Sequence, residues 1–208
     1  MIAIVDYGMG NLRSVQKGLE KVGYQSFITS QPEQVVEAKG VILPGVGAFR
    51  DAMLNLQRTG LDEALRHVVA IRKPLLGICL GLQLIFEGSE ENGWHDGLAL
   101  MPGRVVRLPE GRKIPHMGWN QIYRCREEKV LQEIPEGTYY YFVHSYYART
   151  EESNLIAAVS DYGIPVPAVV SRDNLIGIQF HPEKSSTLGL KILRNYGELV
   201  YDAGNTCH

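Results

Sequence analysis

The chain has 208 residues, of which 45% are hydrophobic, so it is long enough for a single domain, residues 1–208, with a full core. Its 21 basic and 23 acidic residues nearly balance, which argues against the basic surface that nucleic-acid-binding domains use. Cys79, Cys125 and Cys207 lie far apart in the sequence, which excludes a disulfide framework and fits a reducing cytoplasm. The N-terminus lacks a secretory pattern and no apolar run approaches the ~18 residues of a spanning helix, so we expect a cytoplasmic protein without a membrane partner.

The first part of the chain alternates apolar runs with helical patterns. Strands are predicted at residues 2–5, 25–28, 41–43 and 75–78. Helical patterns separate them, one beginning near Pro32 and another running over 48–72 with an interruption at 59–60. This alternation predicts an α/β fold in which helices flank a mostly parallel central sheet.

The turn after the first strand contains Gly8 and Gly10, a spacing seen in dinucleotide-binding loops. Arg13 occupies the position where that fingerprint needs its third glycine, and no acidic residue follows a second strand at the required place. The three cysteines also lack the spacing of metal ligands. We therefore expect no cofactor and no metal ion.

Cys79 lies in the run Gly-Ile-Cys-Leu-Gly at 77–81, where a predicted strand turns into a predicted helix. The two glycines remove the Cβ atoms that would crowd a tight turn, as in the elbow that presents a nucleophilic serine in α/β hydrolases. The amide groups at the start of a helix favour a thiolate. This stretch indicates a nucleophile, and a buried structural cysteine is the alternative that it leaves open.

Two further strand ends carry possible partners for this thiol. The Pro-Gly-Val-Gly loop at 44–47 can turn amide groups toward a ligand, as an oxyanion loop does, or be an ordinary turn. The strand predicted at 175–180 leads into His181, Pro182 and Glu183. A chain bent by Pro182 lets the carboxylate curl back to Nδ1 of the imidazole, although a surface turn is the alternative interpretation.

The pattern changes beyond Glu87. Residues 88–97 are polar, and strand-like runs follow at 104–108, 139–147, 154–160 and 166–171, which predicts a small antiparallel annex. The Pro-His-Met-Gly-Trp-Asn run at 115–120 is predicted as a loop, in which Met117 and Trp119 either anchor a partner or fill the interior. An amphipathic helix, with an apolar stripe from Leu188 to Val200, closes the chain.

These motifs, in this order and at these separations, resemble the class I, triad-type glutamine amidotransferases. The resemblance rests on residues 77–83, 44–47 and 180–183, and it implies a flavodoxin-like sheet. The runs at 6–12, 43–47, 115–120 and 141–146 further resemble the glutaminase subunits of imidazole glycerol phosphate synthase. The run at 115–120 is the most specific of them.

The resemblance implies an enzyme of histidine biosynthesis that hydrolyses glutamine and passes ammonia to a separate (β/α)8-barrel cyclase subunit. The cyclase would form imidazole glycerol phosphate and an aminoimidazole carboxamide ribotide. In this scheme Cys79 attacks the amide, His181 moves protons and Glu183 orients His181. An amidotransferase subunit of another pathway, or a non-catalytic interaction module on the same fold, remains the alternative.

The remaining predictions concern the groups around the triad and the docking face. The oxyanion would be held by the amide of Leu80 and an amide of Val46 or Gly47. By resemblance, Gln83 and the backbone near Ser145 and Tyr146 bind glutamine. The docking face would include two exposed regions: Gly8, Met9, Gly10 and Asn11 in one, and Met117 and Trp119 in the other.

Overall fold

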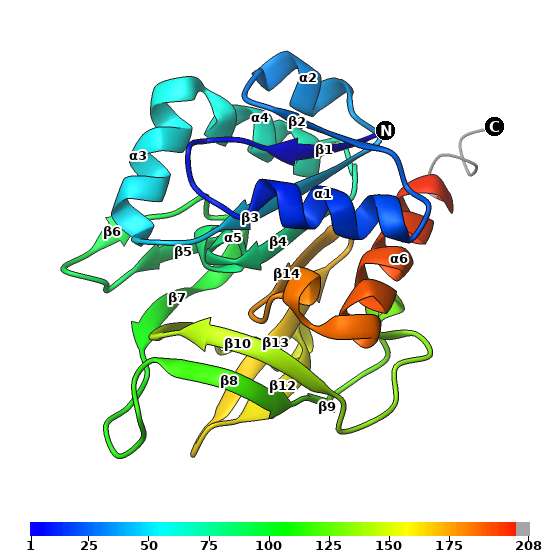
Figure 1. Ribbon diagram of the computed structural model, residues 1–208. Helices are drawn as coiled ribbons and strands as arrows, with labels where there is room; N and C mark the ends of the chain where they lie inside the picture. Colours follow the sequence, from blue (N-terminus) through cyan, green and yellow to red (C-terminus); the bar gives the residue numbers. More distant parts are fainter. Residues whose placement is uncertain (203–208) are drawn as a thin grey trace.

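The computed structural model describes residues 1–202 (Figure 1), so Cys207 lies outside the described residues. Within this range an eight-stranded sheet forms the centre of the molecule. Its strands, in spatial order, are β2 (Ser26–Thr29), β1 (Ile2–Val5), β3 (Gly40–Gly45), β4 (Leu75–Cys79), β14 (Leu175–Ile178), β13 (Pro165–Arg172), β12 (Ile156–Asp161) and β9 (Tyr123–Arg124). The first five of these run parallel and the last three antiparallel, so the predicted α/β class with a mostly parallel sheet is confirmed.

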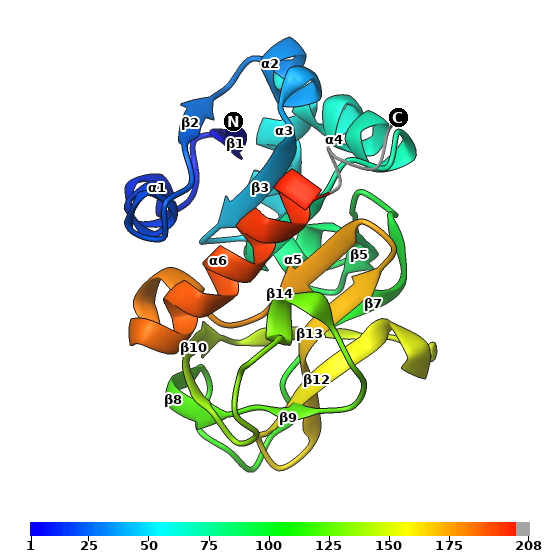
Figure 2. The same ribbon diagram turned by 90° about the vertical axis from the view of Figure 1, so that its right-hand side faces the viewer.

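Helices cover both faces of the parallel strands, as Figure 2 shows for α1 and α4. They are α1 (Leu12–Lys21), α2 (Pro32–Glu37), α3 (Phe49–Thr59), α4 (Leu61–Ala70), α5 (Leu80–Leu84) and α6 (Ser186–Asp202). On β3, Val41 and Leu43 pack with α3 and α4, whereas Ile42 packs with α1 and α6. A central strand buried on both faces needs such a continuous apolar run, which is why the sequence predicted it. None of the helices within residues 1–202 is long and apolar enough to cross a membrane.

The antiparallel part is larger than a single annex, because β13, β12 and β9 extend the main sheet. Two smaller sheets lie beside it, one of β8 (His116–Gln121) with β10 (Tyr139–His144), the other of β11 (Tyr146–Arg149), β7 (Met101–Arg107), β5 (Phe86–Ser89) and β6 (His95–Asp96). Three short 3-10 helices complete the fold: η1 (Lys129–Leu131), η2 (Ser153–Leu155) and η3 (Pro182–Lys184).

Two predictions about local structure in this region are wrong. Residues 116–121 form strand β8 rather than a loop, because they pair along their whole length with β10. Of the two residues that signal a turn, Pro115 lies just before the strand, and Gly118 is tolerated within it because β8 is an edge strand. The aromatic run at 139–147 is two strands that separate at Ser145 and join different sheets.

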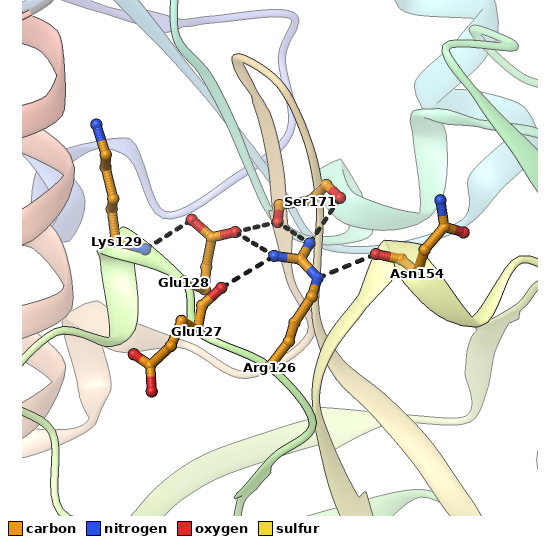
Figure 3. A network of polar contacts seen from close by, with 6 residues as sticks. All are labelled: Arg126, Glu127, Glu128, Lys129, Asn154 and Ser171. Atoms are coloured by element: carbon orange, nitrogen blue, oxygen red, sulfur yellow. Dashed lines mark hydrogen bonds and ion pairs between the residues drawn. The ribbon is translucent and has the colours of Figure 1, made fainter.

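A polar network fixes the chain between β9 and η1 against the main sheet (Figure 3). The Arg126 guanidinium donates to the carbonyl oxygens of Asn154 at 3.0 Å and Ser171 at 2.9 Å, and it pairs with the Glu128 carboxylate at 3.1 Å. Glu128 also accepts a hydrogen bond from the Ser171 hydroxyl. Because guanidinium donors satisfy carbonyls that would otherwise be orphaned, this network anchors the antiparallel half of the sheet far from the carboxyl ends of the parallel strands.

Candidate active site

A cavity of about 400 Å³ lies where the chain leaves the carboxyl ends of β3 and β4 and near the end of β14. Parallel sheets place ligands at this edge, because the turns that follow the strands converge there. The cavity brings together eight of the residues predicted from the sequence: Val46, Gly47, Cys79, Leu80, Gln83, Ser145, Tyr146 and His181. Glu183 is behind His181, in contact with its ring.

Cys79 occupies a strained turn between β4 and α5. Its φ of 56° and ψ of −107° lie where residues with a Cβ are rarely found. The flanking glycines are sterically required, since a Cβ on Gly81 would lie 1.8 Å from the Leu43 carbonyl oxygen and one on Gly77 would lie 2.6 Å from the Gly81 carbonyl oxygen. The turn therefore presents the Cys79 side chain to the cavity in the manner of a nucleophile elbow.

His181 and Glu183 form a buried pair. Nδ1 of His181 lies 2.8 Å from Oε1 of Glu183, and the two side chains are 2% and 1% exposed. Pro182 begins the 3-10 helix η3, and this tight turn is what brings the carboxylate back to the ring. Burial lowers the pKa of His181, but the Cys79 sulfur and the Glu183 carboxylate outweigh it and raise this pKa to about 9. The ring is thus favoured as an imidazolium beside the Cys79 sulfur.

Nε2 of His181 is the atom left for chemistry. Within residues 1–202 it is buried and has no hydrogen-bond partner. His181 also lines the cavity with Cys79. A ring nitrogen in this position can exchange a proton with a group bound between it and the sulfur.

The loop at 44–47 lies directly beside Cys79, because Gly45 is paired with Cys79 in the β3–β4 register. Val46 and Gly47 line the cavity, and Gly47 has a positive φ of 98°. The hydroxyl of Tyr7 fixes the start of this loop by donating to the Pro44 carbonyl oxygen at 2.9 Å. Burial raises the pKa of Tyr7, so this hydroxyl keeps its proton.

Five residues at the site were not singled out by the sequence analysis: Glu91, Val143, His144, Gln179 and Lys184. All but Gln179 line the cavity, and the Val143 carbonyl oxygen lies 3.9 Å from the Cys79 sulfur. Gln179 places its Nε2 atom 3.9 Å from the Cys79 sulfur and its Oε1 atom 3.3 Å from Nε2 of Gln83. A sequence signal existed for Gln179, since it lies two positions before His181 at the end of the strand predicted at 175–180, where alternate side chains share a face. Glu91 lies in the polar stretch 88–97, which carries no pattern that marks a single residue.

Gln83 is turned toward the protein as well as toward the cavity. Its Nε2 atom donates to the Tyr146 carbonyl oxygen at 2.8 Å. Gln83 therefore links α5 to the start of β11, and with it to the Ser145–Tyr146 wall of the cavity.

The residues predicted for a docking face lie outside the cavity lining. Met117 and Trp119 are 58% and 53% exposed on β8. The turn at 8–11 joins β1 to α1, and the Met9 methyl carbon is close to the 44–47 loop, 2.6 Å from where a Cβ on Gly47 would be. Their role in docking stays a prediction.

The comparisons with known proteins agree with the resemblance seen in the sequence. The class-I glutamine amidotransferase family profile matches residues 3–197. The chain is 56% identical over 200 residues to the imidazole glycerol phosphate synthase subunit HisH of Desulfitobacterium hafniense (strain DSM 10664 / DCB-2), covering 96% of this chain and 95% of that protein. It is 55% identical over 207 residues to the subunit of the same name from Moorella thermoacetica, covering 100% and 99%.

Two solved structures share the fold at low sequence identity. A crystal structure of a glutamine amidotransferase superposes with a TM-score of 0.77 at 19% identity, covering 97% of this chain and 100% of the other. The structure of PurLQS from Thermotoga maritima gives a TM-score of 0.75 at 16% identity, covering 97% of each chain. The predicted resemblance and the predicted fold class are confirmed. The chain belongs to the class-I glutamine amidotransferases and, among them, to the family of HisH subunits of imidazole glycerol phosphate synthase.

Proposed function

We propose that the chain, as one catalytic domain spanning residues 1–208, hydrolyses glutamine to glutamate and ammonia for histidine biosynthesis. The observation that carries this is the convergence of a strained-turn thiol, Cys79, with the buried His181–Glu183 pair at one cavity. A thiol, an imidazole and a carboxylate in this relation are the parts of a nucleophilic acyl-transfer site.

The reaction follows from these atoms. The Cys79 sulfur gives its proton to Nε2 of His181 and attacks the side-chain amide carbon of glutamine, and a tetrahedral intermediate forms. His181 donates this Nε2 proton to the departing nitrogen, so that the C–N bond breaks, ammonia leaves and a thioester remains. Nε2 then accepts a proton from water as the water oxygen attacks the thioester. The C–S bond breaks, the sulfur takes the proton back from Nε2, and glutamate is released. The Glu183 carboxylate holds Nδ1–H throughout and stabilises the imidazolium.

The negative oxygen of the two tetrahedral intermediates needs amide donors. Leu80 follows the nucleophile at the start of α5, and Val46 and Gly47 line the same cavity. We assign the oxyanion site to the Leu80 amide and to an amide of Val46 or Gly47. One such donor is worth about 2.7–4 kcal/mol in the transition state, so the orientation of the 44–47 loop controls the rate.

The opposite end of the substrate would meet the wall formed by Gln83, Ser145 and Tyr146. Glu91 adds a carboxylate to this cavity, which suits the ammonium group of a free amino acid. One of its oxygens accepts the Phe49 amide at 2.9 Å, so the carboxylate is held at the N-terminal end of α3.

The ammonia would pass to a partner subunit, for which we propose the (β/α)8-barrel cyclase of the synthase. The support is the HisH name of the relatives, which is the name of one subunit, and the exposed Met117 and Trp119 on β8. Exposed large apolar side chains of this kind are typical of an interface core.

The test separates glutamine chemistry from synthesis in the complex with the cyclase. Cys79→Ala should lower the glutamine-dependent rate on the order of 10³-fold or more, His181→Ala should do nearly the same, and Glu183→Gln should do less. The rate with excess ammonium salt at alkaline pH should survive in all three variants, since ammonia needs no triad. Retained glutamine-dependent activity in Cys79→Ala would refute the proposal.

A further inference from the structure

A chain of four hydrogen bonds runs from the cavity wall to strand β8 without touching the catalytic triad. Nδ1 of His144 lies 2.9 Å from the Tyr146 carbonyl oxygen, and Nε2 of His144 lies 3.0 Å from Nδ1 of His116. Nε2 of His116 lies 3.2 Å from Nδ2 of Asn120, which also donates to the Asp161 carbonyl oxygen at 2.9 Å. Neither histidine has a step in the proposed hydrolysis.

The acceptors at the ends of this chain fix the direction of every proton in it. A carbonyl oxygen only accepts, so Nδ1 of His144 must carry hydrogen and its Nε2 must accept in the neutral ring. Nδ1 of His116 is then the donor to that atom, and its Nε2 accepts from Asn120. The amide orientation of Asn120 is consistent, because its oxygen accepts the Gln121 amide at 2.8 Å.

The surroundings keep both rings neutral and in place. Burial lowers the pKa of His144 to about 3 and that of His116 to about 4. The His116 ring is also stacked between Phe142 and Tyr162, with ring centroids 4.7 and 3.9 Å apart. A second proton, on Nε2 of either ring, would face another donor: Nδ1–H of His116 in the case of His144, or the Asn120 amide in the case of His116. This series of hydrogen bonds therefore exists in one protonation state.

This series of hydrogen bonds ends on the Tyr146 carbonyl oxygen, which has a full set of donors. The Tyr146 oxygen accepts from His144 and from Nε2 of Gln83, which uses both lone pairs. The Leu108 amide donates to the Ser145 carbonyl at 2.9 Å, so Leu108 and Ser145 are a hydrogen-bonded pair between β7 and β11. Such pairs alternate with non-hydrogen-bonded ones in an antiparallel ladder, and the next pair, Arg107 with Tyr146, is of the second kind. The amide and carbonyl of Tyr146 therefore both turn away from β7, to the side where Gln83 and His144 lie. The Tyr146 amide lies in the preceding peptide, which Leu108 holds through the Ser145 carbonyl. The bond from His144 holds the following peptide, so the two bonds together set the orientation of residue 146 at the cavity wall.

We propose that His144, held by His116, is a positioning residue that orients the Tyr146 main chain for binding the amino-acid end of glutamine. This inference rests on the proposed function and adds a determinant of substrate affinity to it. Because the triad does not take part in this series of hydrogen bonds, its loss affects KM far more than kcat.

The test compares two substitutions at His144 in the complex with the cyclase, with steady-state glutamine hydrolysis as the assay. His144→Phe keeps the ring volume and removes both nitrogens, and it should raise KM about tenfold with kcat within about threefold of wild type. His144→Asn leaves a smaller side chain whose amide nitrogen takes the place of Nδ1, and it should hold KM within about threefold. If His144 only filled space, the order of the two KM values would be reversed, and His144→Phe would be the milder change.

Two further variants complete the series. His116→Phe keeps the stack between Phe142 and Tyr162 but removes the donor to His144, and its KM should lie between wild type and His144→Phe. Tyr162→Phe is the matched control, because it keeps the same stack and loses only a hydroxyl that donates to the Lys113 carbonyl, so its KM should not change.

Thermal unfolding of each variant checks that the variant folds. Nitrogen NMR of the wild-type imidazoles provides a readout that is independent of turnover, in which His116 and His144 should both be neutral with the proton on Nδ1. The inference is overturned if His144→Phe keeps the wild-type KM, if His144→Asn is the worse of the two, or if either ring carries its proton on Nε2. Absence of glutamine hydrolysis in wild type would refute the proposed function itself, a result distinct from all of these.

Discussion

Removal of one hydroxyl, in Tyr7→Phe, should slow glutamine hydrolysis by releasing the oxyanion loop. Tyr7 is 3% exposed and donates to the Pro44 carbonyl oxygen at 2.9 Å. The Tyr7 hydroxyl oxygen also packs tightly on Gly45, the residue after Pro44, since a Cβ on Gly45 would lie 2.4 Å from this oxygen. The substitution therefore removes both the donor that holds Pro44 and the atom that limits movement of the following peptide.

The size of the effect follows from the hydrogen bond. A net contribution of about 1 kcal/mol, rising to about 3 kcal/mol when the acceptor stays buried without a donor, corresponds to a decrease of about 5- to 150-fold if it is expressed in the transition state. The assay is kcat for glutamine hydrolysis in the complex, with glutamate as the measured product. The melting temperature should fall by about 2–12 °C over the same range of energies, because each ~1 kcal/mol lowers it by about 2–4 °C in a chain of this length.

Tyr196→Phe is the matched control for this prediction. Tyr196 is likewise a buried tyrosine whose hydroxyl donates to β3, to the Val41 carbonyl at 2.7 Å, and it also reaches the Pro74 carbonyl at 2.9 Å. Both acceptors precede the ends of their strands that face the cavity, so Tyr196→Phe should lower stability and leave kcat unchanged. Equal kcat values for wild type and Tyr7→Phe, or an equal loss in both variants, would refute the anchoring role of Tyr7.

Three further predictions concern the partner, the thiols and the triad. Trp119→Ala should weaken binding of the cyclase at least about tenfold without unfolding the chain, and unchanged affinity in titration calorimetry would contradict the docking face. A glutamine-like electrophile should label Cys79 before Cys125, whose pKa is raised chiefly by burial, and peptide mapping with equal labelling would count against this order. Charged His181 should stabilise the fold fully below pH 6.5 and progressively less as pH rises through about 9, because the Cys79 sulfur and the Glu183 carboxylate raise its folded pKa to about 9 from 6.5. Glu183 supplies part of this stabilisation. The difference in unfolding free energy between wild type and Glu183→Gln should therefore shrink between pH 6.5 and about 9. A difference that stays constant with pH would show that the charge on His181 is not the source of the stabilisation by Glu183.

The parallel half of the fold and the placement of the triad could be predicted because each signal is local. Apolar runs such as 41–43 and 75–78 mark buried strands, and strand ends in a parallel sheet converge on one edge. Placing Cys79 and His181 at such ends was therefore enough to bring them to one cavity. The glycines at 77 and 81 carried a second local signal, since the Leu43 carbonyl excludes a side chain at 81 and the backbone of Gly81 excludes one at 77.

The antiparallel half was harder to predict because its order depends on long-range pairing. Residues 116–121 are a strand only because β10, which follows much later in the chain, pairs with them. The same holds for the missed site residues. Glu91 and His144 reach the cavity through the packing of three sheets, and no spacing in the sequence relates them to Cys79.

Strand β8 presents different chemistry on its two faces, and this restricts how its sequence can change. Met117 and Trp119 are exposed on one face, while His116 and Asn120 bond inward on the other. Because side chains alternate with a period of two, an insertion or deletion within the strand that shifts its register on β10 by one residue would exchange the faces, putting the apolar pair in the interior and the imidazole in water. Divergence here must therefore proceed by substitution at fixed length. A lineage that acquired a single-residue insertion in this strand would lose the exposed apolar pair and the histidine chain in the same event.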